Sequence, residues 1–156
     1  MNIINSMKSI NQYITEKLII KKSSYKYFPQ TRQELKDLMK QLIEERGNDG
    51  DFNDIDTSRI KDMSKLFIYM GRFNGNISKW DVSDVENMEH MFFACYAFNQ
   101  DISNWDVSSV TDMEAMFNGC NSFNQDISNW DVSNVTNMRR IFVECPIEEK
   151  YKPKFK

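Results

Sequence analysis

Residues 80–104 read WDVSDVENMEHMFFACYAFNQDISN, and residues 105–129 repeat this 25-residue sequence as WDVSSVTDMEAMFNGCNSFNQDISN. A third copy begins at Trp130 with WDVSNVTNMRRIFVEC and stops after residue 145. A fixed period of this length without insertions indicates stacked repeats. Since one unit is too small to bury its own apolar face, neighbouring units must share one continuous core.

The same period extends backwards into a degenerate first repeat that begins near Asp51. Met63 and Phe67 stand 25 residues before Met88 and Phe92. This predicts about four repeats in residues 51–145.

Comparison of the copies separates core positions from surface positions. Positions that stay apolar in the copies predict the stacked interior, and they include the columns Val82/Val107/Val132, Met88/Met113/Met138 and Phe92/Phe117/Phe142. Positions that vary freely predict solvent-facing side chains, as in the columns Lys79/Asn104/Asn129, His90/Ala115/Arg140, Phe93/Asn118/Val143 and Tyr96/Asn121/Pro146.

Two local patterns alternate within each repeat. Trp-Asp-Val alternates apolar and polar residues, which is typical of a short half-buried strand. Val110, Met113, Met116 and Phe117 then follow the three- and four-residue spacing of a helix. Each repeat is therefore predicted to be one short strand and one short helix, and the fold class to be an α/β repeat.

A helix over residues 32–46 is predicted ahead of the repeats. Thr31 and Glu34 form a capping box, an apolar stripe follows, and Gly47 is a natural stop. We assign residues 29–50 to a capping helix, because a repeat stack needs its apolar end covered. Residues 1–28 are a predicted helix and extended segment that either docks on the domain, acts as a detachable partner-binding peptide or is disordered. Residues 146–156 are a charged tail that either folds over the last repeat or leaves its end open.

Composition sets broad limits on function. The 156 residues carry a net charge of −3, which argues against a nucleic-acid partner, and contain no apolar run long enough to span a membrane. The N-terminus lacks the pattern of a signal peptide. An intracellular or virion-associated protein is therefore expected rather than a secreted one.

Four residue columns are candidates for chemistry. Cys95/Cys120/Cys145 are interpreted as small buried groups rather than a disulfide or metal site. The columns Asp56/Asp81/Asp106/Asp131 and Asp101/Asp126 are interpreted as turn caps, with a cation site as the alternative. Trp80/Trp105/Trp130 are interpreted as packing residues, with a strip for stacking sugars or bases as the alternative. His90 is the single histidine and has no triad-like partners. We predict no catalytic, cofactor-binding or metal-binding residue and no enzymatic activity.

The stretch FNQDISNWDVSSVTDMEAMFNGCNSFNQDISNWDVSNVTNM, residues 98–138, resembles the BspA-type leucine-rich repeat, also described as the mycoplasma lipoprotein-type 25-residue repeat. The resemblance covers residues 51–145. It implies a short right-handed solenoid of strand-plus-helix turns. It also implies a surface protein engaged in adhesion or host-protein binding, although this chain lacks the long repeat array and sorting tail of such proteins.

The function expected from these features is a non-enzymatic protein-binding or adhesion-type repeat module. The alternatives are a structural assembly protein, such as a phage particle component that associates through the ends of its stack, and a carbohydrate or metal binder. The candidate partner-binding residues are those that vary on the surface: Lys79, Asp84, Glu86, His90, Phe93, Tyr96, Arg139 and Arg140. Phe93 and Tyr96 are the expected anchors, since exposed aromatic residues carry a large share of interface energy.

Overall fold

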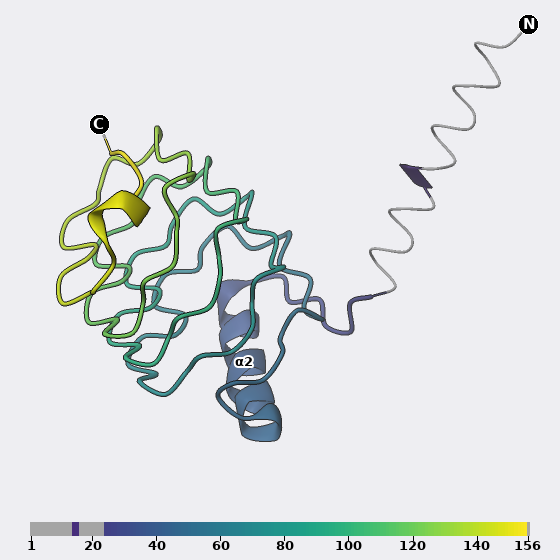
Figure 1. The fold of residues 1–156 in the computed structure, drawn as a ribbon. Coiled ribbons are helices and arrows are strands. Elements are labelled where there is room, and N and C mark those ends of the chain that lie inside the picture. Colours follow the sequence, from purple (N-terminus) through teal and green to yellow (C-terminus); the bar gives the residue numbers. More distant parts are fainter. Residues whose placement is uncertain (1–13, 16–23, 156) are drawn as a thin grey trace, which may run out of the picture.

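The computed structural model describes residues 14–15 and 24–155. It contains the helix α2, Arg32–Arg46, a stack of repeats, and the short 3-10 helix η1, Glu149–Tyr151 (Figure 1). We number the repeats 1 to 4, as residues 51–79, 80–104, 105–129 and 130–145. Helix α2 stands against one end of the stack, and the C-terminus lies at the other (Figure 1). Most of the predicted N-terminal segment 1–28 lies outside the described residues. No helix in the described part of the chain is both long enough and apolar enough to cross a membrane.

Helix α2 is capped at both ends by the predicted residues. The Glu34 N–H donates to Thr31 Oγ1 over 3.2 Å, and Glu34 Oε2 accepts from the Gln30 N–H over 2.7 Å. The Gly47 N–H donates to the Ile43 carbonyl from a backbone with φ 81°, a conformation that glycine adopts without strain. The buried residues of the helix are Leu35, Met39 and Leu42. The prediction of a helix over residues 32–46 is confirmed.

An ion pair fastens α2 to repeat 1. The Arg46 guanidinium donates to both carboxylate oxygens of Asp54, over 2.8 and 3.1 Å, and lies over the rings of Tyr27 and Phe52. These hydrogen bonds lower the pKa of Asp54 and raise the pKa of Arg46. Tyr27 also forms a parallel bridge with Ile55. The segment before the helix and the helix itself are therefore both bound to repeat 1.

The repeats are joined by equivalent segments, residues 62–69, 87–94, 112–119 and 137–144, which we call ladder segments. Four N–H groups of each of the first three donate to carbonyls of the next repeat, all over 2.8–3.0 Å. In repeat 1 the donors are Met63, Lys65, Phe67 and Tyr69, and the acceptors are Asn87, Glu89, Met91 and Phe93. All these bonds point in the same direction along the stack.

The predicted α/β class, with strand-plus-helix turns, is wrong. Among the described residues the repeats contain no helix, and they pair through isolated parallel bridges such as Asn87↔Asp112 rather than through strands. The reason is that two residues of every ladder segment have left-handed backbone, which interrupts a helix and a strand alike. These residues form two columns, Lys65/His90/Ala115/Arg140 and Tyr69/Ala94/Gly119/Glu144.

Phenylalanine columns fill the core. The rings of Phe67, Phe92, Phe117 and Phe142 are stacked with centroids 5.5–5.9 Å apart. Most predicted interior positions are buried, but Met138 is 38% exposed, because no later repeat covers it. Ala115, predicted to face solvent, is buried instead.

Candidate functional site

The cysteine column serves packing. Cys95 and Cys120 are buried, free thiols that donate to the carbonyls of Phe67 and Phe92 over 2.9 and 3.0 Å. Burial raises the pKa of the Cys95 thiol to about 12 and also raises that of Cys120. The interpretation of these residues as small buried groups is confirmed, and a thiol with a raised pKa is a weak nucleophile.

The tryptophan column is also internal. Trp80, Trp105 and Trp130 are 4–5% exposed. Their indole N–H groups donate to the carbonyls of Phe52, Ile77 and Ile102 over 2.9–3.3 Å. The packing interpretation is confirmed, because the rings are not available to stack on a ligand.

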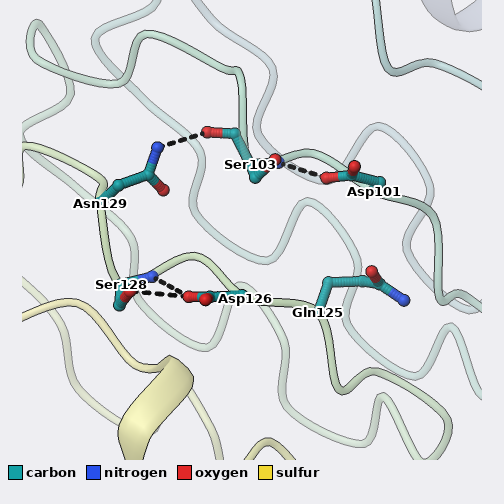
Figure 2. A pocket seen from close by; sticks show the side chains of 6 residues that line it. All are labelled: Asp101, Ser103, Gln125, Asp126, Ser128 and Asn129. Carbon is teal, nitrogen blue, oxygen red and sulfur yellow. Dashed lines mark hydrogen bonds between the residues drawn. The ribbon is translucent and has the colours of Figure 1, made fainter.

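The aspartate columns form the corners of the repeats. Asp101 and Asp126 line a shallow polar pocket (Figure 2). Each accepts the N–H of the serine two residues later, over 2.9 and 3.0 Å, as in an Asx-turn. The hydrogen bonds from Ser103 and Ser128 lower the pKa of both carboxyls. The turn-capping interpretation is confirmed.

The eight predicted partner-binding residues lie in separate places. Lys79, Asp84 and Glu86 are exposed on corners of repeats 1 and 2, where Glu86 lies 3.5 Å from Lys61 Nζ. Arg139 and Arg140 are exposed on repeat 4, at the end of the stack. Among these eight residues, the structure shows a ring contact between His90 and Phe93, while Tyr96 lies against Gly71 of repeat 1.

His90, Phe93 and Tyr96 of repeat 2, together with Tyr69 of repeat 1, form a surface that we call the aromatic patch, in which Tyr69 contacts Phe93 and Tyr96 lies against Gly71, two residues after Tyr69. Tyr69 is 72% exposed and Tyr96 is 54% exposed. The Tyr69 ring meets the half-buried Phe93 ring edge-on at a centroid distance of 5.5 Å, and the His90 ring lies 5.2 Å from Phe93. Large, rigid, exposed rings of this kind are the usual anchors of protein interfaces.

The ladder holds the patch in place. The Tyr69 N–H donates to the Phe93 carbonyl over 2.8 Å, which fixes the two backbones beside each other. Gly71 gives Tyr96 its room, since a Cβ at that position would lie 2.8 Å from Tyr96 Cδ2. The backbone therefore determines the positions of both Tyr69 and Tyr96.

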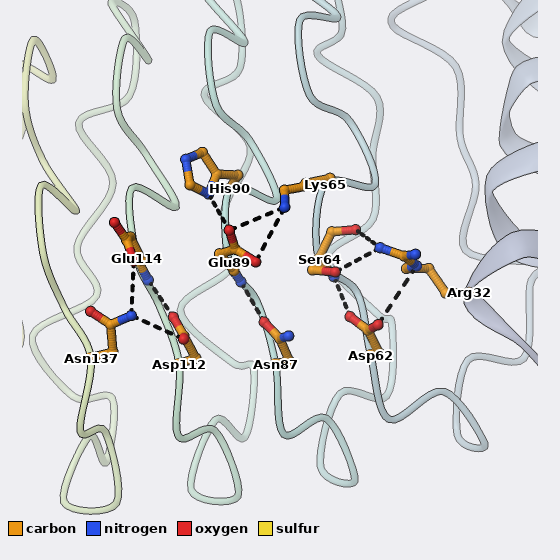
Figure 3. A network of polar contacts seen from close by, with 10 residues as sticks. All are labelled: Arg32, Asp62, Ser64, Lys65, Asn87, Glu89, His90, Asp112, Glu114 and Asn137. Atoms are coloured by element: carbon orange, nitrogen blue, oxygen red, sulfur yellow. Dashed lines mark hydrogen bonds and ion pairs between the residues drawn. The ribbon is translucent and has the colours of Figure 1, made fainter.

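A polar network borders the patch (Figure 3). Glu89 lies between two cationic or potentially cationic groups, with Oε1 at 3.1 Å from Lys65 Nζ and 3.0 Å from His90 Nδ1. The network continues to α2, where Arg32 Nη1 donates to the hydroxyl and the carbonyl of Ser64. It links α2 to repeat 1 and repeat 1 to repeat 2.

Sequence reasoning missed Tyr69. Its column contains Ala94, Gly119 and Glu144, so a large aromatic residue in repeat 1 departs from the other copies. The difference between Tyr69 and the other residues of its column is the feature of the sequence from which its exposure could have been predicted.

Comparison with known proteins gives one match. The family model described as "Mycoplasma protein of unknown function, DUF285" matches residues 34–152. Searches of the curated proteins and of the solved structures each found no significant match.

Proposed function

The chain belongs to the DUF285 family, a family of mycoplasma repeat proteins, and we propose that it is a non-enzymatic protein-binding module whose contact surface is centred on the aromatic patch. The observation that carries the proposal is the exposure of two tyrosines held in place by the fold: Tyr69, whose N–H donates to the Phe93 carbonyl, and Tyr96, which lies against Gly71. Little conformational entropy is lost when such a surface binds a partner, which favours affinity.

The finer assignment to BspA-type repeats, with a role of the binding or adhesion type, is part of this proposal. It is supported by the 25-residue period and by the resemblance of residues 98–138. The net charge of −3 supports a protein partner over a nucleic acid. The raised pKa values of the buried thiols support a function without nucleophilic catalysis.

To test the proposal, peptides that bind the full chain are selected from a random peptide library displayed on phage. Enriched peptides are then titrated against Tyr69→Ala and Tyr96→Ala. Truncation of an interface anchor is expected to cost roughly 2 kcal/mol or more, which is about thirtyfold in Kd. Phe28 is 51% exposed and lies outside the patch, so Phe28→Ala is the matched control and is expected to bind normally.

Unchanged melting temperatures of the variants would show that the loss comes from the contact and not from unfolding. If no enriched peptide depends on Tyr69 or Tyr96, the aromatic patch is not the contact surface.

A further inference from the structure

The ladder segment of repeat 4 has donors without acceptors. In repeats 1 to 3 the equivalent N–H groups all donate to the following repeat. In residues 137–144 the corresponding donors are the N–H groups of Met138, Arg140, Phe142 and Glu144, and they have no acceptor within the part of the chain that the structure describes. We call residues 137–144 the open edge.

The C-terminal tail pairs with residues of repeat 3 and leaves this edge exposed. The tail is fixed where Ile147 is buried and where the Ile127 N–H donates to the Tyr151 carbonyl over 3.0 Å. On the open edge, Met138 is 38% exposed and Val143 is 45% exposed. The free donors therefore lie on accessible backbone, and such a row of unpaired groups is a template for pairing with another chain.

A second copy of this chain does not supply the missing acceptors. Two open edges both present donors, so they do not pair with each other. At the opposite end of the stack, α2 lies beside repeat 1, where Arg32 Nη1 donates over 3.1 Å to the carbonyl of Ser64, the counterpart of the ladder acceptor Glu89, and Lys36 Nζ donates over 3.3 Å to the neighbouring carbonyl of Lys65. The complementary partner is therefore a segment of another protein that takes up the backbone of a ladder segment and offers carbonyl oxygens at alternate residues.

The charge of the edge selects an acidic segment. All ladder bonds point the same way, so the row of free N–H groups is the positive end of the aligned peptide dipoles. Arg139 and Arg140 are exposed there, and Lys152 Nζ lies over the Phe142 ring, whereas Glu144 is the acidic exception.

Repeats 1 and 2 contain a charge pair at the position that corresponds to Arg140. Lys65, the counterpart of Arg140, lies 3.1 Å from Glu89, which the next repeat supplies. Within residues 24–155, no following repeat supplies a carboxylate to Arg140.

We propose that the open edge is a second binding site, which takes up an acidic segment of a partner protein by main-chain pairing of the ladder type, with a carboxylate of that segment beside Arg140. The site is separate from the aromatic patch and does not depend on it.

The probe is a fluorescein-labelled peptide, Val-Thr-Asp-Met-Glu-Ala-Met-Phe-Asn-Gly, the sequence of residues 110–119. In the folded chain residues 112–119 pair in this way with repeat 2, and Asp112 and Glu114 make the segment acidic. Titration of the full chain by fluorescence anisotropy is expected to show saturable binding. The amide hydrogens of Arg140 and Phe142 are expected to become protected from exchange when the peptide binds.

Arg140→Glu is expected to weaken peptide binding about tenfold, because charge reversal replaces an exposed attraction with a repulsion of similar size. This variant is expected to fold, because Glu144 already adopts left-handed backbone with φ 55°. Arg72→Glu, an equal charge reversal on an exposed residue of repeat 1, is the matched control and is expected to bind as the unmodified chain does. A peptide with Asn and Gln in place of the Asp and Glu is expected to bind more weakly.

Lack of saturable binding would overturn the proposal, as would equal affinities of the acidic and neutral peptides. Light scattering that shows the chain to dimerise, with Arg140 and Phe142 already protected, would also overturn it in favour of a second copy. Tyr69→Ala is expected to leave binding of this peptide unchanged, so the test does not depend on the function proposed for the aromatic patch.

Discussion

The two ends of the repeat stack are built in opposite ways. At the first end, α2 buries Leu35, Met39 and Leu42, and its basic side chains donate to carbonyls of repeat 1. At the last end, repeat 4 exposes Met138 and Val143, and its ladder N–H groups have no described acceptor. The difference arises because the stack is polar: every ladder hydrogen bond runs from an N–H group of one repeat to a carbonyl of the next repeat.

This direction decides what each end needs. At the acceptor end, the Ser64 carbonyl accepts from Arg32 of α2, and a carbonyl can accept from a cationic side chain without a paired strand. The donor end needs carbonyls or carboxylates. The tail of the chain pairs with repeat 3 and leaves the ladder segment of repeat 4 uncovered, so the two ends are expected to differ in stability.

The phenylalanine column provides the strongest test of this inequality. Phe92 is fully buried between Phe67 and Phe117, whereas Phe142 is half-buried and has a stacked ring on one side only. Phe92→Ala is expected to reduce the free energy of unfolding by about 3–5 kcal/mol, and Phe142→Ala by roughly half of that. Chemical denaturation measures both values. Equal losses would contradict the view that repeat 4 is an incompletely covered end.

The ion pair at the capped end gives a smaller and pH-dependent effect. Asp54→Asn removes the charged acceptor of Arg46 and is expected to cost about 1.5–3 kcal/mol at neutral pH. The pKa of Asp54 is lowered from its ordinary value of 3.8, so its stabilising contribution is fully present above that value and is lost as the pH falls through the folded-state pKa.

The stability difference between the unmodified chain and Asp54→Asn is therefore expected to shrink below about pH 4, as measured by denaturation at several pH values. A difference that stays constant from pH 7 to pH 2 would show that the Arg46–Asp54 pair does not fasten the cap.

Much of the architecture could be predicted from the sequence, but the local backbone could not. The period, helix α2 and the buried phenylalanine columns follow from apolar spacing and capping residues. The left-handed residues do not, because Lys65, His90 and Arg140 are residue types that seldom adopt that conformation, and of the two columns only Gly119 gives a signal. Since consecutive three-residue turns and helices both place apolar residues three apart, the spacing of Val110, Met113 and Met116 resembles that of a helix although no helix forms there.

Only part of the candidate site could be predicted from the sequence. Variation between the copies identified Phe93 and Tyr96, which belong to the aromatic patch. It also selected Lys79 and Asp84, which lie on other corners, because variation marks exposure and not proximity. The open edge depends on the pairing direction of the ladder, which no residue type encodes.

The most direct test of the account is amide hydrogen exchange of the free full chain, followed residue by residue by NMR. The ladder donors of repeats 1 to 3, such as Phe67, Phe92 and Phe117, are expected to exchange slowly, because their N–H groups are hydrogen-bonded in the core of the stack. Met138, Arg140, Phe142 and Glu144 are expected to exchange orders of magnitude faster, near the rate of unprotected backbone. Comparable protection of the two sets would contradict the central claim that the stack ends in an open row of donors.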